Sequence, residues 1–173
     1  VLYAYLDEYD RAIRYFRQAL AAYEALGYPV YVAEAVYGLA TAYRYSGDRE
    51  TALAAFRRYR DIMAAHGDAG GRFSALYGLG MTHAEMGDCE TALPVIAEAL
   101  AAGGPADYDA ELLKRAAVCH ARQGDSTAAT AALARAREII GGMPELAGTR
   151  WDIGLDKAEA DMHAALGAYD KAY

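Results

Sequence analysis

The sequence has few of the residues that stabilise small folds without a large core. Among its 173 residues are two cysteines, four prolines and one tryptophan. Two cysteines cannot form the disulfide framework of a small secreted domain, so stability must come from the burial of apolar side chains. We expect both thiols to be free, and the length corresponds to about one domain.

Long apolar runs and basic charge are also scarce. No window approaches the roughly 18 apolar residues of a membrane span, and the first ten residues lack the pattern of a secretory signal. Basic residues number 17 against 24 acidic residues, for a formal net charge of −7. Because nucleic-acid binding depends on a basic footprint, we exclude nucleic acid as the main partner, and also direct membrane insertion. We expect a cytoplasmic protein, or a periplasmic one if the full-length chain carries a signal peptide.

The chain repeats itself with a shift of 40 residues. The triplet Tyr37-Gly38-Leu39 recurs at 77–79, and the segment 47–53 recurs at 87–93 with its Gly-Asp pair and its Glu-Thr-Ala-Leu run. A third Gly-Asp pair stands at 124–125, and Ala12 and Phe16 extend the frame backwards. A repeat at this period indicates stacked copies of one structural unit. The predicted units are approximately 1–28, 29–68, 69–104, 105–145 and 146–173.

Within a unit the apolar residues have helical spacing. Val36, Leu39 and Tyr43 form one stripe, and Leu53 and Phe56 begin another after the Gly-Asp pair. Glycine ends a helix in the left-handed conformation and aspartate caps the next helix. No segment shows the sustained two-residue alternation of a strand. The pattern therefore predicts an all-α protein of nine or ten antiparallel helices, with turns near 47, 87 and 124.

This pattern resembles the tetratricopeptide repeat. The third unit fits best, with Leu76, Leu79, Gly80, Gly87, Ala92, Ile96 and Ala99 at the signature positions. The period departs from the usual value of about 34 residues, as in the stretched repeats of several bacterial signalling proteins. The resemblance implies a right-handed α-solenoid of stacked helix–turn–helix units, in which small residues such as Ala40, Gly80 and Ala117 let helices approach.

The residues that could take part in catalysis or bind a metal ion are better explained by a role in packing or in helix capping. His83, His120 and His163 occupy equivalent places in successive units, about one helix pair apart, which is too far to share one ion. The cysteines lack the two-residue spacing of a zinc site, and no strand–turn–helix elbow surrounds a serine. We therefore predict no metal site, no cofactor, no catalytic residue and no enzymatic activity.

The resemblance also implies where a ligand would bind. In that family ligands occupy the concave groove lined by the first helix of each unit. Tyrosine and arginine are enriched at binding hot spots, and a peptide with apolar residues followed by acidic ones would suit an aromatic section that passes into a basic one. The alternative is that the tyrosines only pack. The predicted lining is Tyr5, Tyr37, Thr41, Arg44, Tyr45, Tyr77, Met81, Glu85, Lys114, Arg115, Arg122, Lys157 and Asp161.

The sequence thus predicts a noncatalytic scaffold that binds a protein or peptide, and leaves self-association open. Thr41 and Met81 stand where the chaperone-tail receptors of this family carry asparagine, which argues against that subclass. The alternative is a sensory or regulatory segment of a bacterial signalling protein, such as a diguanylate cyclase or a transcription regulator. Because no polar capping helix ends the repeats, we expect the chain to be part of a longer protein.

Overall fold

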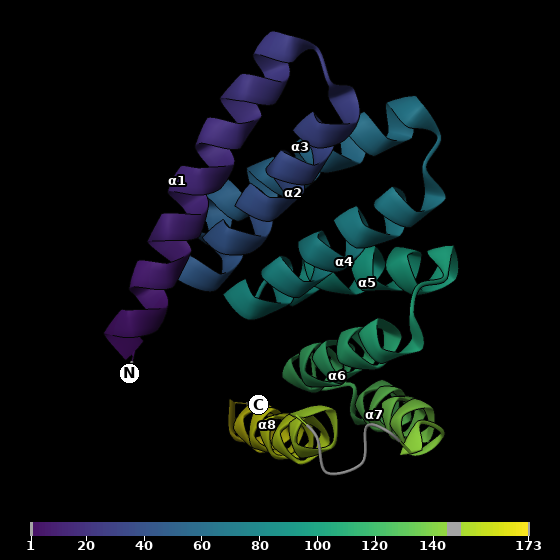
Figure 1. The fold of residues 1–173 in the computed structure, drawn as a ribbon. Helices are drawn as coiled ribbons and strands as arrows, with labels where there is room; N and C mark the ends of the chain where they lie inside the picture. Colours follow the sequence, from purple (N-terminus) through teal and green to yellow (C-terminus); the bar gives the residue numbers. More distant parts are fainter. Residues whose placement is uncertain (1, 145–149, 173) are drawn as a thin grey trace. The chain divides into compact units, whose positions relative to one another are not determined.

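Eight α-helices make up the part of the chain that the computed structural model describes, which is the backbone of residues 2–144 and 150–172 and the side chains of residues 8–144 and 154–168 (Figure 1). No strand occurs within these ranges. The chain is an all-α protein of helix–turn–helix repeats, the α-solenoid class that the sequence predicts. The helices are α1 (Leu2–Leu26), α2 (Pro29–Ser46), α3 (Arg49–His66), α4 (Ala69–Met86), α5 (Cys89–Ala102), α6 (Ala106–Arg122), α7 (Ser126–Gly141) and α8 (Arg150–Ala172).

The prediction of nine or ten helices was wrong at both ends of the chain. Residues 2–26 form one helix, and Ala12 and Phe16 give it the register of a second helix, equivalent to α3. At the other end residues 150–172 form the single helix α8, which continues through Gly167 without a turn. A single helical glycine costs only about 1 kcal/mol relative to alanine, and no capping aspartate follows Gly167 as it does at the true turns.

Helix length explains the 40-residue spacing. The helices α2, α3 and α4 each contain 18 residues. The turns between them hold only two residues, Gly47-Asp48 and Gly67-Asp68. Consecutive first helices α2 and α4 therefore begin 40 residues apart, at Pro29 and Ala69.

The Gly-Asp pairs form the turns, as predicted near Gly47, Gly87 and Gly124. Gly47 has a φ of 94° and its amide donates to the Arg44 carbonyl, which ends α2 in the left-handed conformation. Asp48 then accepts a hydrogen bond from the Thr51 amide at 3.2 Å and starts α3. The same arrangement recurs at Gly67, with a φ of 67°, where Asp68 accepts from the Gly71 amide at 2.9 Å. One turn type therefore serves both within and between hairpins.

We expect Asp125→Ala to lower the free energy of unfolding by about 0.5–2 kcal/mol, because it removes the side chain that caps α7. Asp125 Oδ1 accepts a hydrogen bond from the Ala128 amide at 2.9 Å. Urea denaturation followed by circular dichroism measures the loss. Asp156→Ala, an exposed position inside α8, is the control for loss of one negative charge. Equal losses for the two variants would contradict a capping role.

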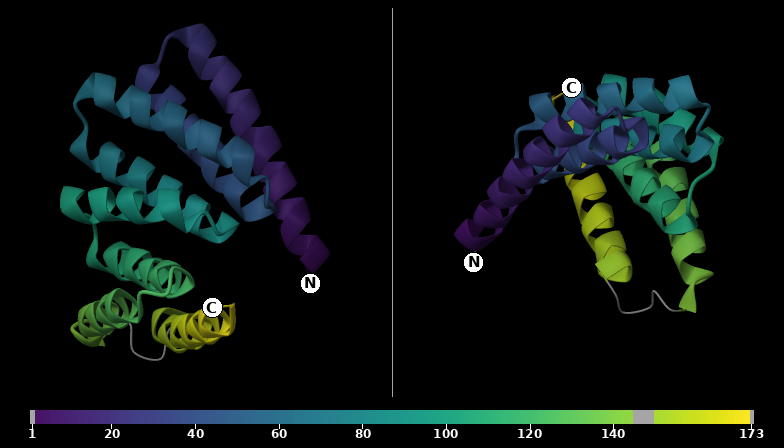
Figure 2. Two further views of the ribbon diagram at one scale, coloured as in Figure 1. Left: turned by 180° about the vertical axis from the view of Figure 1, so that it is seen from behind. Right: turned by 45° about the horizontal axis from the view of Figure 1, so that its top comes forward.

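Contacts divide the chain into two compact units, Val1–Thr82 and His83–Tyr173, and each is described by itself. In the first unit α2 packs against both α1 and α3, and α1 and α2 lie side by side in Figures 1 and 2. Aromatic rings fill the seams between these helices. Phe16 of α1 packs on Gly38 of α2, and Phe56 of α3 packs on Gly78 of α4. An added Cβ at either glycine would overlap the ring, so the repeated Gly is required by the repeated Phe.

In the second unit α6 is the central helix, in contact with α5, α7 and α8. Its core combines fully buried alanines with larger aliphatic side chains. Ala117, one of the small residues predicted to let helices approach, belongs to this core together with Leu133. The small residues allow the close helix approach that buries the large ones. Other members are Ala110, Leu113, Ala129, Ala136, Leu155 and Met162.

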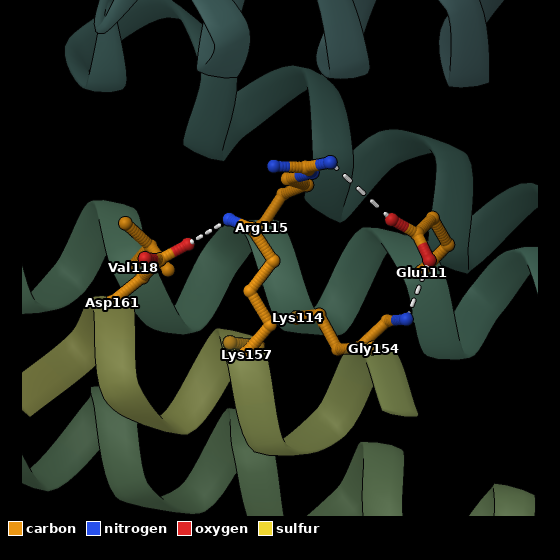
Figure 3. A pocket seen from close by; sticks show the side chains of 8 residues that line it. Glu111, Lys114, Arg115, Val118, Gly154, Lys157 and Asp161 are labelled. Atoms are coloured by element: carbon orange, nitrogen blue, oxygen red, sulfur yellow. Dashed lines mark hydrogen bonds and ion pairs between the residues drawn. The ribbon is translucent and has the colours of Figure 1, made fainter. Parts of the chain in front are cut away.

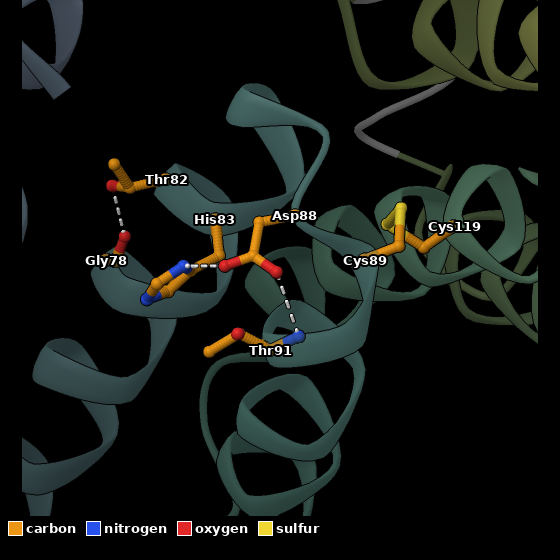
Figure 4. Close-up of polar contacts among 7 residues, drawn as sticks. All are labelled: Gly78, Thr82, His83, Asp88, Cys89, Thr91 and Cys119. Atoms are coloured by element: carbon orange, nitrogen blue, oxygen red, sulfur yellow. Dashed lines mark hydrogen bonds and ion pairs between the residues drawn. A yellow bond between two sulfur atoms is a disulfide. The ribbon is translucent and has the colours of Figure 1, made fainter.

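The cysteines form a disulfide, so the prediction of free thiols was wrong. Cys89 is the first residue of α5 and Cys119 lies three residues before the end of α6, and their Cα atoms are 5.1 Å apart (Figure 4). This separation lies within the range that disulfides span. The two residues are 30 positions apart in sequence, and only the packing of α5 on α6 brings them together.

Candidate peptide-binding faces

The predicted ligand residues of the first unit lie on two first helices. Tyr37 and Thr41 of α2 are partly exposed, as is Tyr77 of α4. Met81, in contrast, is 2% exposed and belongs to the core, where a ligand does not reach it. The side chain of Tyr5 lies outside the described residues.

Tyr45 is the most exposed of the predicted ligand residues of this unit whose side chains the structure describes. Its side chain is 54% exposed. The Tyr9 ring stacks on it with 5.7 Å between centroids and 14° between planes. Arg44, only 6% exposed, places its guanidinium 4.4 Å from the centroid of the same ring. Stacking and cation–π contacts hold the ring in one orientation.

The Tyr37 ring packs against two aromatic rings of the second helix α3. Its ring centroid lies 5.0 Å from that of Tyr59 and 6.0 Å from that of Phe56. Burial raises the pKa of Tyr59, and the neighbouring Tyr37 and Asp68 raise it further, against a hydrogen bond with Ser74. Tyr59 therefore stays neutral at physiological pH. Tyr37 thus both packs and presents part of its surface.

Three of the four predicted basic residues of the second unit, Lys114, Arg115 and Lys157, gather at a cleft between α6 and α8 (Figure 3). The cleft has a volume of about 160 Å³. Four of its eight residues were predicted from the sequence, whereas Glu111, Val118, Gly154 and Ala158 were not. Glu111 could have been found, since it stands one helical turn before Lys114 and Arg115; nothing in the sequence marks Gly154. The lining comprises Glu111, Lys114, Arg115, Val118, Gly154, Lys157, Ala158 and Asp161.

Two ion pairs organise the cleft. Lys114 is 4% exposed, and its Nζ lies 2.6 Å from Glu111 Oε2. On α8, Lys157 Nζ lies 2.7 Å from Asp161 Oδ2. Arg115 Nη2 is 3.5 Å from Glu111 Oε1, at the outer limit of a hydrogen bond. Both carboxylates are thus engaged by lysine.

Two other predicted ligand residues lie away from this cleft. Arg122 is exposed at the end of α6, where an added Cβ on Gly87 would come within 3.3 Å of its Nη1. Glu85 is partly exposed near the end of α4. The second unit therefore brings together Lys114, Arg115 and Lys157, but not Arg122 or Glu85.

The three equivalent histidines have three different environments. His83 is buried, and its Nδ1 lies 2.9 Å from Asp88 Oδ2. Asp88 also accepts the Thr91 amide (Figure 4); the hydrogen bonds from Thr91 and His83 lower the pKa of Asp88. His120 is partly exposed and His163 is exposed. Among the residues with described side chains, no three His, Cys, Asp or Glu groups converge as metal ligands.

Two serine hydroxyls donate hydrogen bonds to backbone carbonyls of their own helices. Ser46 Oγ donates to the Tyr43 carbonyl at 3.0 Å, and Ser74 Oγ donates to the Gly70 carbonyl at 3.1 Å. No helix in the described ranges is long and apolar enough to cross a bilayer.

Comparison with known proteins agrees with this architecture. Two family models, both described as tetratricopeptide repeat, match residues 1–65 and 77–144. The chain belongs to the tetratricopeptide repeat family, whose repeats generally mediate protein–protein interaction. No curated protein matches the chain.

Proposed function

We propose that this chain is a noncatalytic interaction module that binds an extended or helical segment of a partner protein on its first-helix faces. The observation that carries the proposal is the exposed ring of Tyr45, which stacks with Tyr9 and makes a cation–π contact with Arg44. A rigid, exposed aromatic loses little conformational entropy on binding and buries a large area, which are the properties of a hot-spot residue. Partly exposed Tyr37 and Tyr77 extend the same kind of surface.

The disulfide between Cys89 and Cys119 helps to choose between the cytoplasmic and periplasmic alternatives. Disulfides persist in oxidising environments and are rare in a reducing cytoplasm. The bond between Cys89 and Cys119 therefore supports the periplasmic alternative over the cytoplasmic one.

We expect Tyr45→Ala, Tyr37→Ala and Tyr77→Ala each to weaken peptide binding by at least about 2 kcal/mol, the size of a hot-spot loss. The ligands are peptides selected by display against the whole chain, and isothermal titration calorimetry measures their affinity. Arg122→Ala should instead slow association and reduce its salt dependence, because exposed charges steer encounter.

Arg57→Ala, at an exposed position on the second helix α3, is the matched control and should leave affinity unchanged. Tyr45→Phe keeps the stacked ring and should retain most of the binding. If the first-helix and second-helix variants lose affinity equally, or if none does, the first-helix face is not the ligand site and the tyrosines only pack.

A further inference from the structure

The helix α1 has two sides that differ in how they are covered. Within the first unit α1 packs against α2, and Figures 1 and 2 show α1 at the edge of that unit with α2 on one side of it. The seam with α2 uses three aromatic residues of α1 at seven-residue spacing, Tyr9, Phe16 and Tyr23. The side of α1 beyond these rings has no neighbouring helix in the described part of this unit.

This second side carries an apolar stripe, named here the outer stripe. Tyr15 is 65% exposed and Leu26 is 62% exposed, and these are the most exposed of the large hydrophobic side chains that the structure describes. Between and beside them Ala22 is exposed, and Ala12 and Ala19 are partly exposed. The steps between these five residues are three and four positions, which is the spacing of one helix face.

Comparison with α3 shows that this side of a second helix is ordinarily buried. Ala52 and Phe56 of α3 are 0% and 2% exposed, whereas the equivalent residues of α1, Ala12 and Phe16, are partly exposed. The difference arises because α3 packs on the first helix of its own unit, α2, with Tyr37 against Phe56. The outer stripe is therefore a helix-packing surface without its cover, and exposed apolar surface of this kind marks an interaction site.

The order of large and small side chains makes the outer stripe complementary to itself. Two α1 helices can pack antiparallel about a two-fold axis at Ala19. Tyr15 of each copy then faces Ala22 of the other, and Leu26 faces Ala12. Every large side chain meets a small one, and the alanines at the axis let the helices approach closely. A contact of this kind uses the same surface on both copies, as two-fold symmetry requires.

The charges near the outer stripe favour the same pairing. The last turn of α1 contains no basic residue, although the carbonyl end of a helix attracts a cation. An axis at Ala19 brings the exposed Arg11 of one copy beside Gly27 of the other, directly after that turn. Each copy thus supplies the cation that the helix end of the other lacks.

We propose that the outer stripe is the interface of a symmetric dimer, in which two copies of this chain pack through antiparallel α1 helices. A second copy is the occupant that the stripe specifies, because the stripe fits itself in both side-chain size and charge. With two large side chains from each copy, the contact belongs to the interfaces below about 1,200 Å² of buried surface, so the dimer is reversible. The interface does not include Tyr45 and is independent of the proposed peptide binding.

Sedimentation velocity of the whole chain over a range of concentrations tests the proposal. We expect the mass to rise with concentration from that of one chain towards that of two. Tyr15→Ala should weaken the dimer at least tenfold, because it leaves a gap opposite Ala22. Ala22→Tyr should weaken it comparably, because two rings would then overlap. The double variant exchanges the large and small positions and should regain most of the affinity, since residues in contact are not additive.

Two controls match these variants. Tyr108→Ala removes an exposed tyrosine from the second unit and should dimerise like the unmodified chain. Ala19→Cys places two thiols at the two-fold axis, so mild oxidation should join the copies in a disulfide, seen on a non-reducing gel. Ala21→Cys, at an exposed position two residues further along α1, should give little of this product.

Three results would overturn the proposal. They are a monomer at every concentration, equal dimerisation of Tyr15→Ala and Tyr108→Ala, and equal cross-linking of Ala19→Cys and Ala21→Cys. If Ala22→Tyr fails to fold by circular dichroism, Tyr15→Ala and the cross-linking decide the result. Peptide affinity is measured separately, so loss of the dimer in Tyr15→Ala with unchanged peptide binding would leave the proposed function intact.

Discussion

Replacing Gly78 with alanine is expected to lower the free energy of unfolding by about 1–3 kcal/mol, the usual cost of overpacking a core. The new Cβ would overlap Cε1 of Phe56 in the seam between α3 and α4. Alanine is otherwise the better helix former by about 1 kcal/mol. The sign of the change in the free energy of unfolding therefore shows whether the overlap with the ring or the higher helix propensity of alanine dominates. We expect the overlap to dominate.

Gly70→Ala is the matched control, since it lies on the same helix. Its added Cβ would meet only Asp68 Oδ1, at 3.4 Å, so this variant should be as stable as the original or more so. Urea denaturation compares the two. Phe56→Leu should restore part of the stability lost in Gly78→Ala, because residues in contact are not additive. A Gly78→Ala protein as stable as Gly70→Ala would contradict the ring-on-glycine packing.

Removing the disulfide by the double substitution Cys89→Ala and Cys119→Ala is expected to lower the free energy of unfolding by about 3–4 kcal/mol. The bond closes a loop of sequence separation 30, and loop-closure entropy in the unfolded chain predicts a loss of this size. The effect should appear in urea denaturation of oxidised protein.

The reductant dithiothreitol supplies the control. It should destabilise the original chain and leave the double variant unchanged, which separates loss of the bond from loss of cysteine packing. Mass spectrometry after alkylation counts the free thiols. Two free thiols in protein prepared under oxidising conditions would show that the bond does not form.

Local sequence determined the helices and most of their ends. Apolar spacing places Leu39 and Phe56 on the buried faces of their helices, and each Gly-Asp pair ends one helix and caps the next. These effects act over three or four residues, so they can be predicted without knowing any partner helix. Gly167 does not end α8, since a glycine without a following capping residue costs a helix only about 1 kcal/mol.

The helical register assigned several charged residues to one face, including Arg122, which lies away from the cleft between α6 and α8. Lys114 and Arg115 on α6 and Lys157 on α8 line one cleft, because equivalent positions of successive first helices face the same side. The same reasoning placed Met81 on that face, where it is buried. Periodicity predicts the face of a helix, but only neighbouring side chains determine whether a residue at its edge reaches solvent.

Only the tertiary structure determined the contacts between segments that lie some 20 to 40 residues apart in the sequence. Phe56 requires Gly78 to lack a side chain, Cys89 meets Cys119, and Lys114 extends against Gly154. Each depends on how closely two helices approach and on their relative rotation, which are set by the packing of the whole unit and not by either segment alone. The sequence therefore determines the repeat and its turns, whereas the disulfide and the cleft between α6 and α8 arise only when the helices pack.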